Sequence, residues 1–327
     1  METLELIRLN LLSPMVLAFV LGILATLVRS DLTIPPAMYT ALSIYLLLAI
    51  GLKGGAALAQ TPLTEFWRPA LATLLLGSAI PLWSYVVLRR IGKIDIANAA
   101  ALAAHYGSVS AVTFIATQAF LNGAGVTFEG YTPTLVALLE VPAIIIALLI
   151  AHLNLPNEQE PEENSLRRAL HEILSGKSIL LLLGGVVIGL LSGPAGLELV
   201  APLFVEPFEG ALTLFLLELG MVASRRFGDV RKAGFFLLGF GIVMPVLHGV
   251  IGVFLGYVTG MSAGGSTILG VLAASASYIA APAAVRLALP QASPSLYLTA
   301  SLAITFPFNL IVGIPLYYAV AQRIFGG

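Results

Sequence analysis

The sequence predicts an all-α protein that crosses the membrane about ten times, and its composition carries this prediction. Hydrophobic residues make up 58% of the 327 positions, and charged residues only 10%. An ordinary soluble domain has about 25% charged residues, so this chain has too little polar material to cover a water-facing surface. With a mean hydropathy of +0.98, the chain cannot be a soluble enzyme, a nucleic-acid-binding protein or a disordered scaffold.

Long apolar runs, separated by breaker or charged clusters, identify the individual helices. A membrane-spanning helix needs about 20 apolar residues, and these continuous runs lack the alternation typical of transmembrane strands. We place the helices at residues 11–29, 38–59, 69–88, 97–121, 131–153, 178–194, 208–224, 233–258, 265–289 and 296–321. The first run follows an acidic N-terminus, without a small-residue cleavage site, and is interpreted as a membrane helix rather than a signal peptide.

The distribution of Lys and Arg predicts the orientation, because cytoplasmic connections carry an excess of both. Connections after the odd-numbered helices hold Arg29, Arg89, Arg90, Lys93, Arg167, Arg168, Lys177, Arg225, Arg226, Arg231 and Lys232. The other side holds Arg8, Arg68 and Arg323, with Lys53 near the end of the second helix. We therefore expect odd-numbered connections in the cytoplasm and both termini outside.

Short motifs recur in the two halves of the chain in the same order. Ile50-Gly51-Leu52 resembles Leu219-Gly220-Met221, 169 positions later, and Gly107-Ser108-Val109-Ser110 resembles Ala274-Ser275-Ala276-Ser277, 167 positions later. Val141-Pro142 resembles Phe306-Pro307, 165 positions later. These matches predict two repeats of five helices each, at residues 1–153 and 178–327. Because five is odd, the second repeat must be inverted, as in many secondary transporters.

A polar stretch joins the two predicted repeats. Residues 154–164 contain two prolines and four glutamates, a composition typical of a flexible linker. Residues 165–174 follow with their apolar side chains on one helical face, which predicts an amphipathic helix at the membrane surface. The alternative is a docking site for a cytoplasmic regulator. The whole segment 154–177 is expected to be cytoplasmic.

Two helices contain interruptions at corresponding places in the two halves. His105 to Ser110 interrupts the fourth run, and Ala273 to Tyr278 interrupts the ninth, with Pro282 at the start of a new half-helix. Corresponding interrupted helices are the best sequence indication of a transporter's binding site. Each break would present a half-helix N-terminus, whose free N–H groups and dipole favour an anion. Alternatively, the small residues only let helices pack closely.

Oxygen-bearing side chains near these breaks are candidate cation ligands. Glu140 lies midway along the fifth run, where an ionisable residue is functional by default, and Thr305 and Asn309 flank Pro307 in the tenth. Such oxygens suit Na⁺, although a proton carrier would also use Glu140. Glu218 in the seventh run is either an ion ligand or a structural partner. His248 is interpreted as an interhelical hydrogen-bonding residue.

The sequence lacks the motifs of membrane enzymes and pumps. It contains no HExxH and no GxxxxGK[ST]. It has no cysteine, and its four histidines lack metal-ligand spacing. We therefore expect neither an enzyme nor a bound cofactor.

Several motifs together resemble the cyanobacterial sodium-dependent bicarbonate transporter family, SbtA. They lie at residues 50–55, 217–221, 274–290, 293–295, 304–309 and 313–315. The resemblance implies a homotrimer in the bacterial inner membrane, with an elevator-like core that moves against a scaffold, and transport of bicarbonate with Na⁺. It also implies a PII-like trimeric regulator as a possible cytoplasmic partner.

The resemblance also implies the site residues by matching motif. The expected bicarbonate site comprises Gly107, Ser108, Ser110, Ser275, Ala276, Ser277 and Tyr278. The expected Na⁺ ligands are Thr113, Glu140, Thr305 and Asn309. One departure stands out: the family pattern has a further serine before the threonine, where this chain has Val112.

The function predicted from the sequence is therefore Na⁺-coupled bicarbonate symport. A carrier of another small anion, a Na⁺/H⁺-coupled carrier and a non-transporting membrane receptor are the alternatives.

Overall fold

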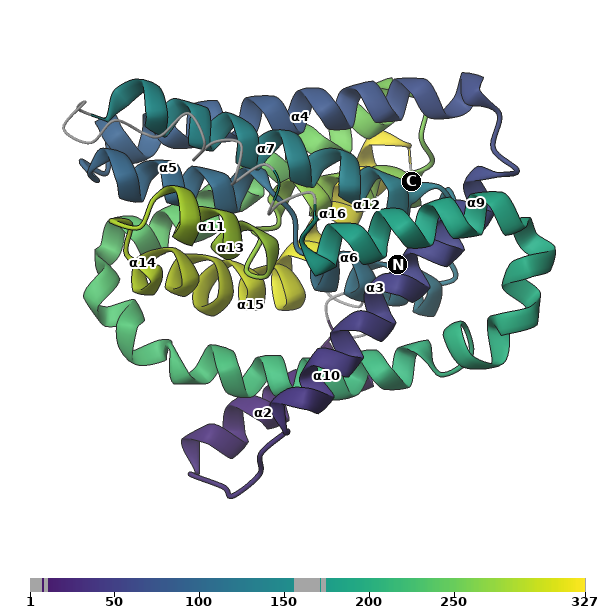
Figure 1. Cartoon of the computed structure of the whole chain (residues 1–327), viewed down its shortest axis with the longest axis horizontal. Helices are drawn as coiled ribbons and strands as arrows, with labels where there is room; N and C mark the ends of the chain where they lie inside the picture. Colours follow the sequence, from purple (N-terminus) through teal and green to yellow (C-terminus); the bar gives the residue numbers. More distant parts are fainter. Residues whose placement is uncertain (1–7, 9–10, 156–170, 172–174, 327) are drawn as a thin grey trace.

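The computed structural model describes residues 8, 11–155, 171 and 175–326, which fold into helices joined by short connections (Figure 1). The part before the linker forms α2 (Pro14–Leu27), α3 (Pro36–Leu58), α4 (Leu63–Arg90), α5 (Ile96–Gly107), α6 (Ala111–Gly123) and α7 (Thr132–Asn154). Most of the predicted linker and its amphipathic helix at 165–174 lie outside the described residues.

The part after the linker forms a second series of helices. These are α9 (Lys177–Phe204), α10 (Phe208–Arg225), α11 (Phe227–Val258), α12 (Ala263–Ala274) and α13 (Ala280–Ala288). The last helix is composite: α14 (Pro294–Leu298), the π-helical turn η1 (Thr299–Thr305), α15 (Phe306–Phe308), the π-helical turn η2 (Asn309–Gly313) and α16 (Ile314–Ile324).

Within the described residues, seven helical spans are long and apolar enough to cross a membrane. They are Pro36–Leu58, Leu63–Arg90, Ile96–Gly123, Thr132–Asn154, Leu180–Phe204, Gly234–Val258 and Pro294–Ile324. The helices α2 and α12 are apolar but shorter. Length and composition thus indicate a multi-pass membrane protein.

One helix is kinked close to the residue where the sequence predicts its end. We expect the sixth run to end at residue 194, and the backbone of α9 leaves the helical conformation at Gly193. Gly193 adopts φ 63°, a conformation that glycine reaches without a steric penalty. Pro194 then begins a new helical segment, a position that suits its fixed φ and missing N–H. The first helical segment of α9 therefore ends at this kink, and a second segment follows as far as Phe204.

Two pairs of helices pack in close contact through glycines. In the first pair, α3 crosses α9: a Cβ on Gly55 would overlap the Val186 carbonyl, and one on Gly189 the Leu52 carbonyl. In the second pair, α2 packs along α10, where a Cβ on Gly220 would overlap the Phe19 carbonyl. Small residues let helix backbones approach in this way within a membrane.

The remaining helices form a second group. The helix α4 packs on α5 and α7, and α11 packs on α12 and on the composite last helix. Figure 1 shows α4 along one edge of the molecule and α2 with α10 along the opposite edge. We call α2, α3, α9 and α10 the scaffold group, and the other helices the core group.

Hydrogen bonds join the two halves of the core group. Trp83 Nε1 of α4 donates to His248 Nε2 of α11 at 2.7 Å, which confirms the interhelical role expected for His248. At one end, Asn98 Oδ1 accepts from Ser293 N–H at 2.7 Å. At the other end, the Glu129 carboxylate accepts from Ser262, the N-cap residue of α12.

Candidate functional site

Two core helices are interrupted at the positions that the sequence predicts. Between α5 and α6, the backbone is non-helical from Ser108 to Ser110, and Ser110 is the N-cap of α6. Between α12 and α13, helical structure is lost from Ser275 to Ile279. The first turns of α6 and α13 begin at these breaks, so each leaves backbone N–H groups without an intrahelical partner.

Three hydrogen bonds join the two breaks directly. Ser110 N–H donates to Ser275 Oγ at 2.9 Å, and Ser277 N–H donates to the His105 carbonyl at 2.8 Å. Ser110 Oγ also lies 3.1 Å from the Tyr278 hydroxyl, to which it donates. Backbone groups that lose their helical hydrogen bonds in one half of the chain therefore form hydrogen bonds with the other half.

Ser110 organises the start of α6. Its Oγ accepts from Thr113 N–H at 3.1 Å, as an N-cap does, and from Thr113 Oγ1 at 2.9 Å. Together with the bond to Tyr278, these contacts place three hydroxyl groups side by side at the N-terminus of α6.

A small cavity lies against both breaks. Its volume is about 20 Å³, and its polar lining comes from Ser110, Ser277, Tyr278 and Glu140. Four of the predicted site residues thus share one cavity, although they come from three different helices or breaks. A cavity of this size holds about one water-sized group.

Glu140 is the one ionisable carboxylate among the residues that line this cavity. It lies on α7, two residues before Pro142, and its side chain is buried, with 6% of its surface exposed. Pro142 has no N–H, so it frees a carbonyl one turn earlier in the helix. A buried carboxylate is retained in a protein only when a cation, a proton or hydrogen bonds compensate its charge.

Four further predicted residues, including Ser275, lie at the breaks without lining the cavity. Ser108 is fully buried, and its hydroxyl has no partner among the described residues. Gly107 permits close packing, since a Cβ there would crowd the Pro81 ring and the Ala143 methyl group. Ala276 is buried in the core cluster around α5 and α13. A buried hydroxyl without a partner costs about 1–3 kcal/mol, which makes Ser108 a candidate ligand group.

The last helix contributes two predicted residues, both fully buried. Asn309 donates from Nδ2 to the Ala274 carbonyl at 2.8 Å, at the end of α12. Thr305 Oγ1 donates to the Gly241 carbonyl at 2.8 Å and lies 2.7 Å from the Tyr106 hydroxyl. Their π-helical turns flank Pro307, and such turns often occur at functional sites. Both side chains therefore contact the interrupted helices, but neither lines the cavity.

Glu218 and Val112 lie apart from the cavity lining. Glu218 is buried on α10, where one carboxylate oxygen, Oε2, has no hydrogen-bond partner among the described residues. Val112 is 3% exposed within the hydrophobic core and does not line the cavity.

Five lining residues were not predicted from the sequence: Leu47, Val109, Ala111, Leu182 and Ile279. Leu47 of α3 and Leu182 of α9 close the cavity from the scaffold group. No polar signal marks them, because they are apolar residues within apolar runs. Both leucines lie close to the point where Gly51 of α3 packs on Gly185 of α9. In the sequence, only these neighbouring glycines could have indicated that this part of α3 and α9 faces the site.

These features define a multi-pass membrane protein in which two broken helices meet at a small cavity that contains polar groups, an arrangement used by secondary transporters. A family profile described as the Na⁺-dependent bicarbonate transporter superfamily matches residues 14–322. The chain therefore belongs to this superfamily, as the sequence motifs predict. No curated protein matches the chain.

Proposed function

We propose that this protein is a Na⁺-coupled bicarbonate symporter. The observation that carries the proposal is the shared cavity, where hydroxyl groups of both breaks meet the buried carboxylate of Glu140. Anion-binding groups and a cation-binding group thus face the same space. Binding Na⁺ beside bicarbonate would bring two opposite charges into a buried site together, which reduces the electrostatic cost of either one alone.

Bicarbonate would lie at the N-termini of α6 and α13, where the helix dipoles favour negative charge. Ser110, Ser277 and Tyr278 would donate hydrogen bonds to it, with Ser108, Ser275 and the backbone at Gly107 and Ala276 around them. The present cavity, about 20 Å³, is large enough for one water-sized group. The two breaks must therefore separate before the larger anion enters, and the bond from Ser110 to Tyr278 would yield to the substrate.

Na⁺ would be held by Glu140, with Thr113, Thr305 and Asn309 as further oxygen donors. Carboxylate, hydroxyl and amide oxygens are suitable ligands for a hard cation. Thr113 contacts Ser110 directly, and Asn309 contacts the end of α12. A modest movement of the last helix would bring these oxygens to the cavity, so the Na⁺ site would be completed only in one conformation.

The two halves would form inverted five-helix repeats, residues 1–153 and 178–327. Two contacts support this symmetry, because each joins corresponding segments of the two halves: Trp83 bonds His248, and Ser110 bonds Ser275. Corresponding segments touch each other when they lie near a two-fold axis. The reciprocal packing of α2 on α10 and α3 on α9 is the pattern expected of such repeats.

Alternating access would then follow an elevator movement. The scaffold group packs through close glycine contacts, while hydrogen bonds join the halves of the core group. The cavity lies where the two groups meet, since Leu47 and Leu182 of the scaffold face Ser110 and Glu140 of the core. Sliding of the core along this apolar surface would carry the site across the membrane.

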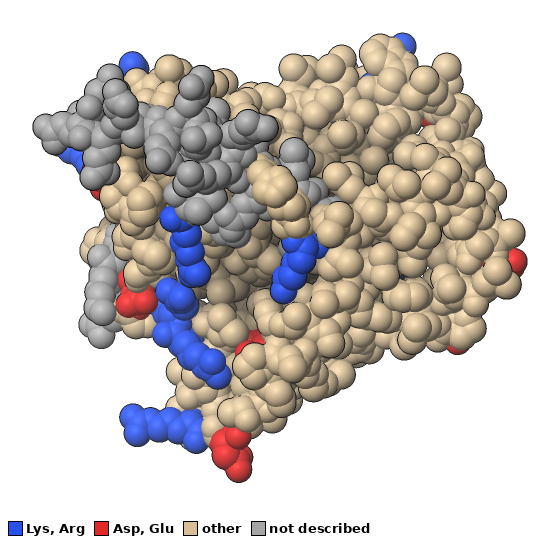
Figure 2. Space-filling model, viewed as in Figure 1, with Lys and Arg blue, Asp and Glu red and all other residues tan. Residues whose placement is uncertain are grey.

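The assembly, location and regulation of the protein are part of the same proposal. A homotrimer in a bacterial inner membrane and a PII-like cytoplasmic regulator follow from the family resemblance. The charge distribution supports the predicted orientation: in Figure 2, most of the visible Lys and Arg side chains gather toward the end that carries the α2–α3 connection. Arg29 and Arg225 are both exposed, and this end would face the cytoplasm.

The decisive experiment is uptake of radiolabelled bicarbonate into proteoliposomes, with and without an inward Na⁺ gradient at fixed pH. The proposal predicts accumulation that depends on the gradient and on both ions. Uptake without Na⁺ dependence would exclude symport. No uptake by folded protein would exclude bicarbonate as the substrate, and a screen of other small anions would follow.

A further inference from the structure

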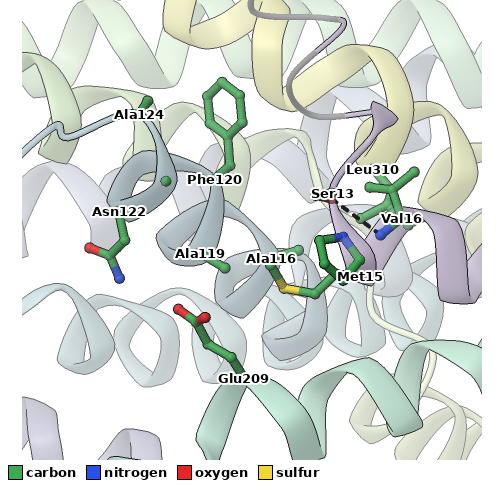
Figure 3. Close-up of a pocket in the computed structure, with 12 residues that line it drawn as sticks. Ser13, Met15, Val16, Ala116, Ala119, Phe120, Asn122, Ala124, Glu209 and Leu310 are labelled. Atoms are coloured by element: carbon green, nitrogen blue, oxygen red, sulfur yellow. Dashed lines mark hydrogen bonds between the residues drawn. The ribbon is translucent and has the colours of Figure 1, made fainter.

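A second, larger cavity lies between the scaffold and core groups, away from the breaks. Its volume is about 440 Å³, and Figure 3 shows it bordered by Met15 of α2, Ala119 of α6 and Glu209 of α10. Asn122 and Glu209, both exposed, stand at its mouth. Its inner part is apolar, with Ala116 and Leu310 among its lining residues.

The inner end of this cavity approaches the site along three helices at once. Ala116 lies one turn beyond Thr113 on α6, and Leu310 lies one turn beyond Phe306 on the last helix. Val16 also lines the cavity, and Phe19 follows it one turn later on α2. Residues three or four positions apart occupy the same face of a helix. On each of the three helices, the face that lines the larger cavity therefore continues toward the breaks.

A row of aromatic rings runs from α2 to the cavity at the breaks. Phe19 of α2 packs edge-to-face against Phe306, with ring centroids 5.3 Å apart. Phe306 packs in the same manner against Tyr278, again at 5.3 Å. Tyr278 in turn lines the cavity at the breaks. One continuous row of rings thus joins the scaffold helix α2 to the site.

We propose that the larger cavity is the outer vestibule through which Na⁺ and bicarbonate reach the breaks, and that Phe19 and Phe306 form the barrier at its inner end. This inference rests on the proposed transport function and orientation. Phe19 belongs to the scaffold and Phe306 to the core, so a relative movement of the two groups separates the rings. The barrier then opens without any rearrangement inside either group.

The natural absence of cysteine permits a direct test with single-cysteine variants. Ala116→Cys and Ala119→Cys introduce thiols inside the vestibule, and Thr127→Cys introduces one at an exposed position of the connection that follows α6. Ala103→Cys, in the fully buried interior of α5, is the matched negative control. Each variant is treated from outside, in right-side-out vesicles, with a membrane-impermeant cationic methanethiosulfonate.

We expect the reagent to modify positions 116, 119 and 127 but not position 103. Modification at position 116 should reduce bicarbonate uptake at least fivefold, because the added group occupies the path. Modification at position 127 should leave uptake unchanged. The vestibule proposal would be wrong if position 116 did not react while position 127 did. It would also be wrong if bicarbonate uptake were unchanged after full modification at position 116.

The barrier is tested at Ala111, which lines the cavity at the breaks. We expect Phe19→Ala to raise the external labelling rate of Ala111→Cys at least tenfold, whereas Phe19→Leu, which keeps most of the side-chain volume, changes it little. An equal rate in both variants would exclude Phe19 from the barrier. If Phe19→Ala fails to fold, as size-exclusion chromatography would show, Phe306→Ala and Phe306→Leu provide the same comparison.

These outcomes remain separate from the transport proposal. If the unmodified protein takes up bicarbonate but position 116 is unreactive, only the vestibule is wrong. If the protein shows no uptake while positions 116 and 119 react from outside, the access route stands and the assigned substrate is wrong.

Discussion

Glu140 is the residue on which the proposed coupling depends most. It supplies the one carboxylate among the lining of the cavity at the breaks. We expect Glu140→Gln to reduce Na⁺-driven bicarbonate uptake at least tenfold, because the amide keeps the shape of the side chain but loses the charge that attracts Na⁺. The measurement is uptake into proteoliposomes over a range of Na⁺ gradients.

Assembly of the variant should be unaffected, since burying a neutral amide costs less than burying a charge. Size-exclusion chromatography checks this point. Unchanged Na⁺ dependence in Glu140→Gln would remove Glu140 from the ion site.

Tyr278 offers a second test at the scale of a single atom. Tyr278→Phe removes the hydroxyl that lies 3.1 Å from Ser110 Oγ but keeps the ring that packs on Phe306. One hydrogen bond contributes about 0.5–1.5 kcal/mol, so we expect the half-saturating bicarbonate concentration to rise about 2- to 10-fold.

Tyr297→Phe is the matched control, because the Tyr297 hydroxyl is buried without a partner among the described residues. This control should transport normally. Equal effects of the two substitutions would mean that the Tyr278 hydroxyl does not contact the substrate.

At this scale, the polar residues that line the cavity at the breaks are all among the predicted site residues, whereas the apolar ones are not. Ser110, Ser277 and Glu140 stand out because each is a polar residue within an apolar run, and such residues are costly at membrane depth unless they are used. Leu47 and Leu182 line the same cavity but are indistinguishable from lipid-facing leucines. Their role depends on how helices distant in the sequence pack, which no local pattern encodes.

Among the structural elements, the crossing of α3 and α9 sets the surface that faces the site. Gly189 lies where a Cβ would overlap the Leu52 carbonyl. We therefore expect Gly189→Ala to lower the stability of the protein by about 1–3 kcal/mol, as overpacking does. The measurement is the apparent melting temperature in detergent.

Gly184→Ala, on the same helix with nothing near its Cβ, is the control. It should be neutral or stabilising by about 0.5–1 kcal/mol, because alanine favours helix more than glycine does. Equal melting temperatures of the two variants would argue against the close crossing.

The same scale shows why helix ends are harder to predict than helix interiors. The breaks at Ser108–Ser110 and Ser275–Ile279 follow from small polar residues inside long apolar runs. The predicted end at residue 194 likewise coincides with a kink in α9, where the backbone is non-helical at Gly193. The local sequence does not show that a second helical segment follows to Phe204, because that segment belongs to the same apolar surroundings.

For the whole molecule, the elevator proposal predicts which helices change their distance during transport. Val16 of the scaffold and Leu310 of the core line the same cavity. We expect a short, reducible bifunctional cross-linker between Val16→Cys and Leu310→Cys to stop bicarbonate uptake, and reduction to restore it. The physical reason is that the cross-link joins the two groups that must slide.

The control is a cross-link within one group. Asn98 and Ser293 are hydrogen-bonded at 2.7 Å inside the core, so the same cross-linker between Asn98→Cys and Ser293→Cys should leave transport intact. Full uptake by the cross-linked Val16–Leu310 variant would rule out relative movement at this interface.

The contact between Trp83 and His248 has an optical consequence. The chain contains two tryptophans: Trp67 is exposed on the surface of α4, whereas Trp83 donates to a buried imidazole at 2.7 Å. Replacing Trp67 by phenylalanine would leave a single indole at the junction of the two halves. Its fluorescence would stay constant while the core slides as one body, and would change only if that body came apart. The protein thus carries a natural spectroscopic reference for its own rigidity.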